Sequence, residues 1–179
     1  MTTSSRPRVN HLGRDVSSRI PAWDAVPGLV ALGERDEAIW ALAAPYLTVR
    51  DNDAHSLFSY GLAAALLSQL PEANEAIVLP AILLHDTGWS TVDEREALEA
   101  IAPGGGVPEL VLKHEKEGAR IAREILHTVG LPAGDIERIT EIIDGHDSRT
   151  HSMVPADSIV DDADKLWIVT DHCRSVFSD

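Results

Sequence analysis

Cysteine and basic side chains are scarce in this chain. Cys173 is the only cysteine, so no internal disulfide can form and a cluster of thiolate ligands is excluded. Lysine and arginine number 15 against 29 acidic residues, which gives a formal net charge of −14 at pH 7. Because such an acidic surface repels phosphates, we expect no nucleic-acid partner.

Long apolar runs are also missing. None reaches the ~20 residues that a transmembrane helix needs, and the opening MTTSSRPRVN is not followed by the apolar stretch of a secretion signal. We therefore expect no membrane partner and a cytoplasmic location, which agrees with the lone cysteine. Residues 1–20 lack periodicity and predict a flexible tail ahead of a single domain over 21–179.

Helical periodicity dominates the rest of the chain, and no segment shows a convincing strand pattern. The expected helices cover 35–47, 51–70, 71–86, 90–102, 107–130, 132–147 and a last segment from 156 on. Pro71 stands at a helix entry, Pro80 is expected to kink or divide its helix, and Gly130 to cap the helix before it. The glycines of PGGG (103–106) predict a flexible loop. The sequence thus predicts an all-α fold.

Four of the eight histidines lie in, or at the end of, four different apolar helices: His55, His85, His114 and His146. Two of them are followed at once by an aspartate, as in LLHD and DGHD. One such histidine is usually an ordinary core or surface residue. Four helices that each bring a polar residue to their apolar side instead build a buried polar site, and a metal ion compensates imidazoles and carboxylates best.

A further carboxylate is expected from the segment IVDDADKLW near the end of the chain. Asp164 borders the apolar stripe of its helix, Asp161 lies near that stripe, and Asp162 lies on the solvated side. Periodicity by itself leaves both Asp161 and Asp164 open as ligands.

The ordered set of His55, His85-Asp86 and Asp164, within DADKL, resembles the hallmark of the HD-domain superfamily of metal-dependent phosphohydrolases. The resemblance covers residues 50–170. The tract HEKEGARIAREIL is similar to the His-x-x-x-Gly helix of members that bind two metals, and IIDGHD is similar to their segment with the fourth histidine. The resemblance implies a helical bundle with a metal site between helices, and it favours Asp164 over Asp161.

The implied site is dinuclear and holds two divalent transition metals. Asp86 would bridge them, and His55, His85 and Asp164 would complete one metal. His114 and His146 would complete the other. Nitrogen and oxygen ligands of this kind suit Fe, Mn, Co, Ni or Zn. Asp86 and His85 are the residues expected to be catalytic.

The resemblance implies hydrolysis of a small phosphomonoester or nucleotide-like compound, with a metal-bridging hydroxide as the nucleophile. The alternative uses the same ligands. Relatives such as the myo-inositol oxygenases and some phosphonate-cleaving oxygenases hold two irons and use O₂ to oxidise or cleave a small hydroxylated substrate or a phosphonate. A regulatory nucleotide-binding domain is a third option, which the complete ligand set disfavours. The oligomeric state is left open, with a homodimer as one option.

Candidates for contact with a small anionic substrate are Arg149, His151, Lys113 and Trp89. Arg149 is preferred among the cations because it follows His146 in a polar loop. The other cations considered are Lys116, Arg120 and Lys165, and Lys165 has Asp161 or Asp162 as alternative partners. Trp89 stands where specialised relatives carry an acid or a histidine. It either stacks on a substrate ring or packs in the core, and the usual burial of tryptophan slightly favours the core.

Overall fold

The computed structural model describes residues 29–49, 51–101 and 107–177. The predicted tail over 1–20 and the predicted loop over 103–106 lie outside these ranges. The α-helices are α1 (Glu34–Ala43), α2 (Asn52–Leu67), α3 (Glu75–Leu84), α4 (Glu94–Ile101), α5 (Pro108–Val129), α6 (Ala133–Ile143), α7 (Pro155–Leu166) and α8 (Asp171–Phe177). Three 3-10 segments join them, η3 (Ala44–Tyr46), η4 (His85–Thr91) and η5 (Trp167–Val169). The described part has no strand, which agrees with the predicted all-α class.

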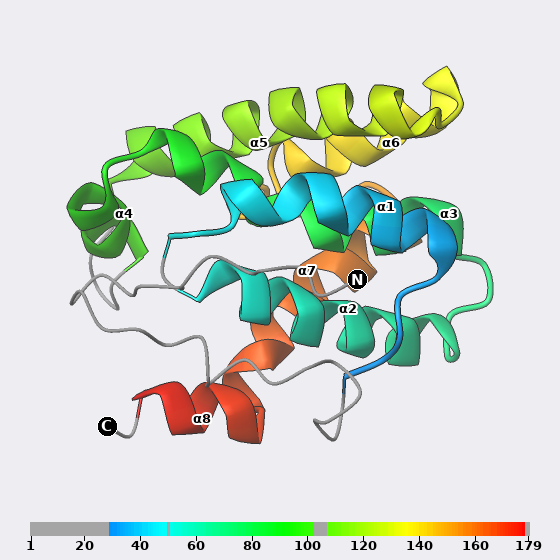
Figure 1. Ribbon diagram of the computed structural model, residues 1–179. Helices are drawn as coiled ribbons and strands as arrows, with labels where there is room; N and C mark the ends of the chain where they lie inside the picture. Colours follow the sequence, from blue (N-terminus) through cyan, green and yellow to red (C-terminus); the bar gives the residue numbers. More distant parts are fainter. Residues whose placement is uncertain (1–28, 50, 102–106, 178–179) are drawn as a thin grey trace, which may run out of the picture.

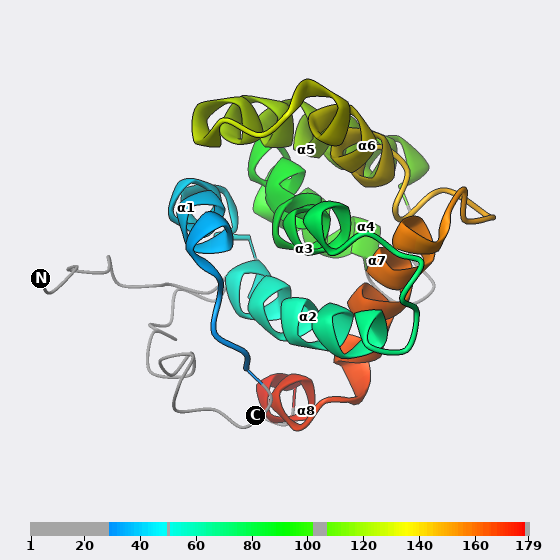
Figure 2. The same ribbon diagram turned by 90° about the vertical axis from the view of Figure 1, so that its right-hand side faces the viewer.

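Helix α3 forms the centre of the molecule. Every residue from Ile77 to Leu84 is buried, and α1, α2, α6 and α7 all contact this helix. A helix that is apolar on every side is stable only when other elements surround it. Figure 1 and Figure 2 show how the other helices enclose α3. The continuous apolar run in the sequence therefore specifies the central position of this helix.

Helix α3 differs from the prediction at its start, and of the two outcomes expected at Pro80 its division is not observed. The helix begins at Glu75 rather than at Pro71, because the side chain of Asn74 accepts a hydrogen bond from the N–H of Ala76 and caps the N-terminus. Pro80 lies inside α3 but does not divide it into two helices. Neighbouring helices hold both halves in place.

Helices α5 and α6 form a pair along one side of α3 (Figure 1). Gly130 ends α5 in the left-handed conformation, with φ 86°, and its N–H donates to the carbonyls of Leu126 and His127. The predicted C-cap is therefore confirmed. Helix α6 ends at Ile143, earlier than predicted, because Gly145 takes φ 125° and the chain leaves the helix there. His146 consequently lies in a turn.

Helix α7 lies on the side of the molecule opposite α1 and packs against α2 and α3 (Figure 2). The helix predicted over 90–102 begins only at Glu94, since residues 85–91 form η4 instead. Among the described residues, no helix combines the length and the apolar character needed to span a membrane.

Candidate metal centre

The site begins where α3 ends, at His85. The ring of His85 is fully buried, and its Nδ1 donates a hydrogen bond to the carbonyl of Ile82 at 2.8 Å. His146 repeats this arrangement, since its Nδ1 donates to the carbonyl of Ile143 at 2.9 Å. Both bonds leave Nε2 as the nitrogen that faces the site. A backbone acceptor of this kind commonly orients a histidine that binds a metal.

One group of donor atoms joins α2, the end of α3 and α7. The Nε2 atoms of His55 and His85 lie 3.1 Å apart. The Oδ1 atom of Asp164 lies 2.8 Å from Nε2 of His55 and 3.4 Å from Nε2 of His85. We call His55, His85 and Asp164 the first group, and their donor atoms are close enough to hold one metal ion.

A second group joins α5 to the turn after α6. The Nε2 atoms of His114 and His146 lie 3.4 Å apart. The Oδ2 atom of Asp147 lies 3.3 Å from Nε2 of His114 and 3.7 Å from Nε2 of His146. We call His114, His146 and Asp147 the second group, and this set is also compact enough for one metal ion.

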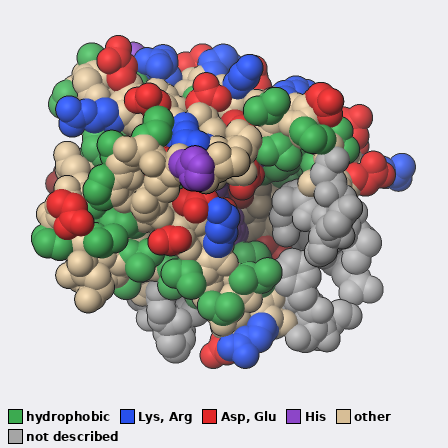
Figure 3. Space-filling view, turned by 180° about the vertical axis from the view of Figure 1, so that it is seen from behind, with side chains coloured by type: hydrophobic (Ala, Val, Ile, Leu, Met, Phe, Trp, Pro, Cys, Tyr) green, Lys and Arg blue, Asp and Glu red, His purple; other side chains and the backbone are tan. Residues whose placement is uncertain are grey.

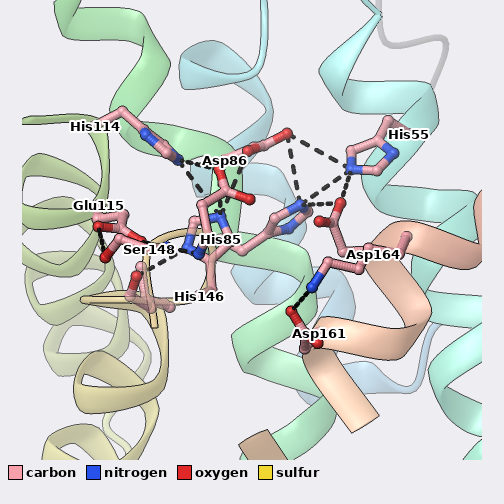
Figure 4. Close-up of polar contacts among 12 residues, drawn as sticks. His55, His85, Asp86, His114, Glu115, His146, Ser148, Asp161 and Asp164 are labelled. Carbon is pink, nitrogen blue, oxygen red and sulfur yellow. Dashed lines mark hydrogen bonds and ion pairs between the residues drawn. The ribbon is translucent and has the colours of Figure 1, made fainter. Parts of the chain in front are cut away.

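Asp86 lies between the two groups (Figure 4). Its Oδ2 atom lies 3.6 Å from Nε2 of His55 and 3.5 Å from Nε2 of His85. Its Oδ1 atom lies 3.9 Å from Nε2 of His146. One carboxylate therefore directs one oxygen to the first group and the other oxygen toward the second.

Close packing of η4 on α5 brings these groups together. A Cβ at Gly88 would lie 1.8 Å from the carbonyl oxygen of His114 and 2.5 Å from the nitrogen of Gly118. A Cβ at Gly118 would lie 3.2 Å from the carbonyl oxygen of His85. Gly118 is the glycine of the His-x-x-x-Gly pattern. Its physical role is to let the backbone that carries His85 and Asp86 approach α5 and His114.

The charges of the site differ between its two ends. Burial lowers the pKa of His85, but the carboxylates of Asp86 and Asp164 outweigh burial and raise it to about 10. Burial and the neighbouring His146 lower the pKa of His114 to about 3. Burial opposes ionisation of Asp86 and Asp164, but nearby histidines lower the pKa of both carboxyls.

This donor set fits divalent metals. Ionised carboxylates attract a cation, and the inward-facing imidazole nitrogens supply borderline ligands that suit transition metals. At the second group, two Nε2 atoms face each other across 3.4 Å while the low pKa keeps His114 neutral. A cation between them would satisfy both lone pairs.

The structure favours the core interpretation of Trp89 over the substrate-stacking one. The indole is 2% exposed and lies parallel to the ring of His114, with centroids 3.9 Å apart and an interplanar angle of 9°. Its neighbours in a small apolar cluster include Val92 and Ala97. Trp89 therefore packs behind the second group, as the core interpretation expected, and is not available to a substrate ring.

Arg149 also differs from its predicted role as a substrate cation. Its guanidinium donates to Asp157 and to the carbonyls of Glu141 and Asp144, each at 2.8 Å. Asp157 is buried and also accepts from the N–H of Met153. Arg149 thus ties the end of α6 to the start of α7, and its donors are engaged by protein acceptors.

The remaining cations have simpler surroundings. Lys113 is exposed and donates to the carbonyl of Thr91 at 2.8 Å, and His151 is exposed on the loop after α6. Arg120 pairs with Glu117 and Glu124 on its own helix. Lys165 pairs with Asp161, one of its two expected partners.

Sequence reasoning missed two members of this region, Asp147 and Glu115. For Asp147 a signal was present, because DGHD repeats the His-Asp dipeptide of LLHD. For Glu115 no comparable signal existed. It is 1% exposed, and its contacts depend on residues more than 30 positions away.

The site opens toward the face that carries α7 and the loop after α6. The side chains of Asp147 and Asp164 are 33% and 19% exposed, whereas those of His85 and His114 are fully buried. Figure 3 shows this face, with an exposed histidine near its centre and acidic and basic side chains beside it. Asp147 and Asp164 are therefore the most accessible side chains of the two groups.

The comparisons with known proteins agree with this geometry. A family model described as HD domain matches residues 52–167, which run from the start of α2 to the end of α7 and include every histidine and aspartate of the two groups. Searches of curated proteins and of solved structures find no match.

Proposed function

Because the chain belongs to the HD domain family, we propose that it is a metal-dependent phosphohydrolase with a dinuclear site. The proposed ligands are His55, His85 and Asp164 for one metal, and His114 and His146 for the other. Asp86 bridges the two. The proposed substrate is a small phosphomonoester or a nucleotide-like compound.

The observation that carries this proposal is the position of Asp86. Its two oxygens face opposite groups, at 3.5 to 3.6 Å on one side and 3.9 Å on the other. Bidentate bridging by one carboxylate is a common way to hold two metals a few ångströms apart. Two such metals, when bound, supply an activated water and stabilise negative charge on a phosphoryl group.

The protein itself positions the ligands and excludes water from behind them. Trp89 covers the ring of His114, and the ring of Trp167 lies edge-on to His55 with centroids 4.7 Å apart. These contacts hold both imidazoles in place. Asp86 remains ionised in its buried position, which preserves its capacity to bind two cations.

An anionic substrate of an acidic protein needs a local cation at the opening, and we propose Lys165 for this role. Partial burial lowers the pKa of Lys165, but its hydrogen bond to Asp161 and the nearby charges of Asp164 and Asp147 raise it. The ammonium group is therefore charged and lies within electrostatic reach of the carboxylates at the opening. His151, four residues after Asp147, and Lys113 remain further proposed substrate contacts.

The test compares hydrolysis with oxygen chemistry. The protein is purified anaerobically, its metals are measured, and phosphate release and O₂ consumption are followed over phosphate esters, phosphonates and polyols. We expect phosphate release with manganese or cobalt and no O₂ uptake. An iron-loaded protein that is active only with O₂ would establish the diiron oxygenase instead.

The variant Asp86→Ala tests both the activity and the metal content. Removing the bridge should abolish activity and prevent metal binding at both groups. The control is Asp162→Ala, because Asp162 is exposed on α7 and lies outside the site. Retention of two metals by Asp86→Ala would overturn the bridging assignment.

A further inference from the structure

The two groups are built alike, although the proposed ligand sets are unequal. The proposed ligands of the first metal are two imidazoles, the terminal carboxylate of Asp164 and the shared Asp86. Those of the second metal are two imidazoles and the shared Asp86. Asp147, the third member of the second group, stands where a terminal carboxylate of the second metal would be expected.

The distances support this equivalence. Asp164 places Oδ1 at 2.8 and 3.4 Å from the two imidazole nitrogens of its group. Asp147 places Oδ2 at 3.3 and 3.7 Å from the two imidazole nitrogens of the second group. In each case the carboxylate oxygen and both Nε2 atoms surround one small volume, which is the arrangement that three ligands of one metal require.

Hydrogen bonds to Glu115 hold the backbone at Asp147. Glu115 is buried, and its Oε1 accepts hydrogen bonds from the N–H of Asp147 at 2.9 Å and from the N–H of Ser148 at 2.8 Å. Its Oε2 accepts from the hydroxyl of Ser148 at 2.8 Å (Figure 4). A buried carboxylate is costly unless hydrogen bonds satisfy its oxygens, and here all three bonds come from the segment that follows His146.

Glu115 follows His114 directly on α5. The same turn of α5 therefore carries His114 and anchors the loop that carries His146 and Asp147. Fixing the N–H groups of Asp147 and Ser148 fixes the direction in which Asp147 leaves the backbone. If Glu115 only stabilised the loop, its hydrogen bonds could go to any N–H of the loop. Instead one of them goes to the N–H of Asp147, whose carboxylate faces both imidazoles.

We propose that Asp147 is a ligand of the second metal, equivalent to Asp164 in the first group, and that Glu115 is its positioning residue. The inference rests on the proposed dinuclear site. It adds a seventh ligand to that site and places a terminal carboxylate on each side of the opening. The two metals then have matched surroundings, with two imidazoles and one terminal carboxylate apiece.

The test is a manganese titration of the metal-free protein, followed by metal analysis and by electron paramagnetic resonance of the bound Mn²⁺. The wild-type protein should bind two ions and show the signal of a coupled pair. Asp147→Ala should keep one ion with unchanged affinity and lose the other, together with the coupled signal. Asp164→Ala should do the reverse, by weakening the ion of the first group.

Glu115 is tested with two variants. Glu115→Ala removes the anchor and should weaken the second ion ~10- to 100-fold, the usual effect of losing a group that orients a metal ligand. Glu115→Gln should restore binding, because the amide oxygen accepts both N–H groups and the amide nitrogen can donate to Ser148. Glu124→Gln is the matched control, since Glu124 is exposed on the same helix.

The outcomes separate the two proposals. Fewer than two ions in the wild-type protein would overturn the dinuclear function and this inference with it. Two ions in the wild type and two, with unchanged affinity, in Asp147→Ala would overturn the inference alone. If Glu115→Ala does not fold, Asp147→Ala decides the role of Asp147. The role of Glu115 then rests on Ser148→Ala, which removes one of its three bonds and should weaken only the second ion.

Discussion

In the folded protein His85 holds its proton at a higher pH than a free histidine does. In the unfolded chain the pKa of a histidine is ~6.5, whereas in the folded protein Asp86 and Asp164 outweigh burial and raise the pKa of His85 to about 10. Between these values the native state holds a proton that the unfolded state has lost. The stabilisation is therefore complete below pH ~6.5 and is lost as pH rises toward 10.

This difference predicts the pH dependence of stability. From pH 6.5 to 10, the free energy of unfolding of the metal-free protein should fall by at most ~1.4 kcal/mol per pH unit for this one proton. His85→Gln should remove most of that slope. Denaturant unfolding of both proteins at several pH values provides the measurement, and equal slopes would contradict the assignment.

The pKa of His114 is shifted in the opposite direction, so His114 affects stability in a different pH range. Burial and His146 lower its folded-state pKa to about 3. The unfolded chain therefore takes up a proton below pH ~6.5 that the native state refuses. The contribution of His114 to stability is present above that pH and is lost as pH falls toward 3, so the two histidines can be measured separately.

At the scale of the elements, the contact between η4 and α5 tolerates no added atom at Gly88. Gly88→Ala would place a methyl group 1.8 Å from the carbonyl oxygen of His114. Because backbone atoms cannot move aside as a flexible side chain does, we expect a loss of ~3 kcal/mol or more in the free energy of unfolding. Metal affinity should fall as well, since the change separates Asp86 from His114.

Gly134→Ala is the matched control for this change. Nothing lies within 4 Å of a Cβ at Gly134, which is in the first turn of α6. Its stability should be unchanged or slightly higher, because alanine favours helix more than glycine. Urea unfolding and metal content of both variants test the pair, and a stable Gly88→Ala protein would refute the packing argument.

The connection between α6 and α7 depends on Arg149 and Asp157. Arg149→Ala would leave the buried carboxylate of Asp157 without its cation, which costs ~3 kcal/mol or somewhat less because Arg149 is partly exposed. Arg120→Ala is the control, since Arg120 pairs only with glutamates on its own helix, and should cause little change. A stable Arg149→Ala protein with weakened substrate affinity would instead restore the substrate role predicted from the sequence.

At the scale of the whole molecule, bound metals would cross-link distant parts of the chain. The proposed ligands come from α2, the end of α3, α5, the turn after α6, and α7. A ligand that binds only the native state at 100 times its Kd stabilises it by ~2.7 kcal/mol. Chelation should therefore lower the thermal midpoint, and added Mn²⁺ should restore it. Asp86→Ala should show neither change.

The helical fold could be predicted from the sequence, and so could most residues of the candidate site. The apolar run of α3 specified a central helix, and four histidines in four apolar helices indicated that polar side chains meet in the interior. Helix ends were less predictable. Pro71 was a plausible start, but the side chain of Asn74 caps α3, and a glycine in a left-handed conformation ends α6 before His146.

Single-residue roles depended on neighbours that are remote in the sequence. Arg149 was expected to bind substrate because of its place after His146, yet Asp157 and two carbonyls hold its guanidinium. Asp147 was visible in DGHD, but periodicity says nothing about its distance from His114. Such contacts are decided by packing between elements, which local patterns do not encode.

The sequence by itself determined the all-α class, the family and the ordered set of histidines and aspartates, because helical periodicity and motif spacing are local properties. Only the tertiary structure decided that Asp86 faces two groups, that Glu115 anchors the backbone of Asp147, and that Trp89 is closed to solvent. Each of these depends on the approach of η4 to α5 and of the turn after α6 to the same helix. These close contacts are possible because Gly88 and Gly118 carry no side chain and because Glu115 accepts hydrogen bonds from the turn. Such interactions exist only when segments ~30 residues apart pack together.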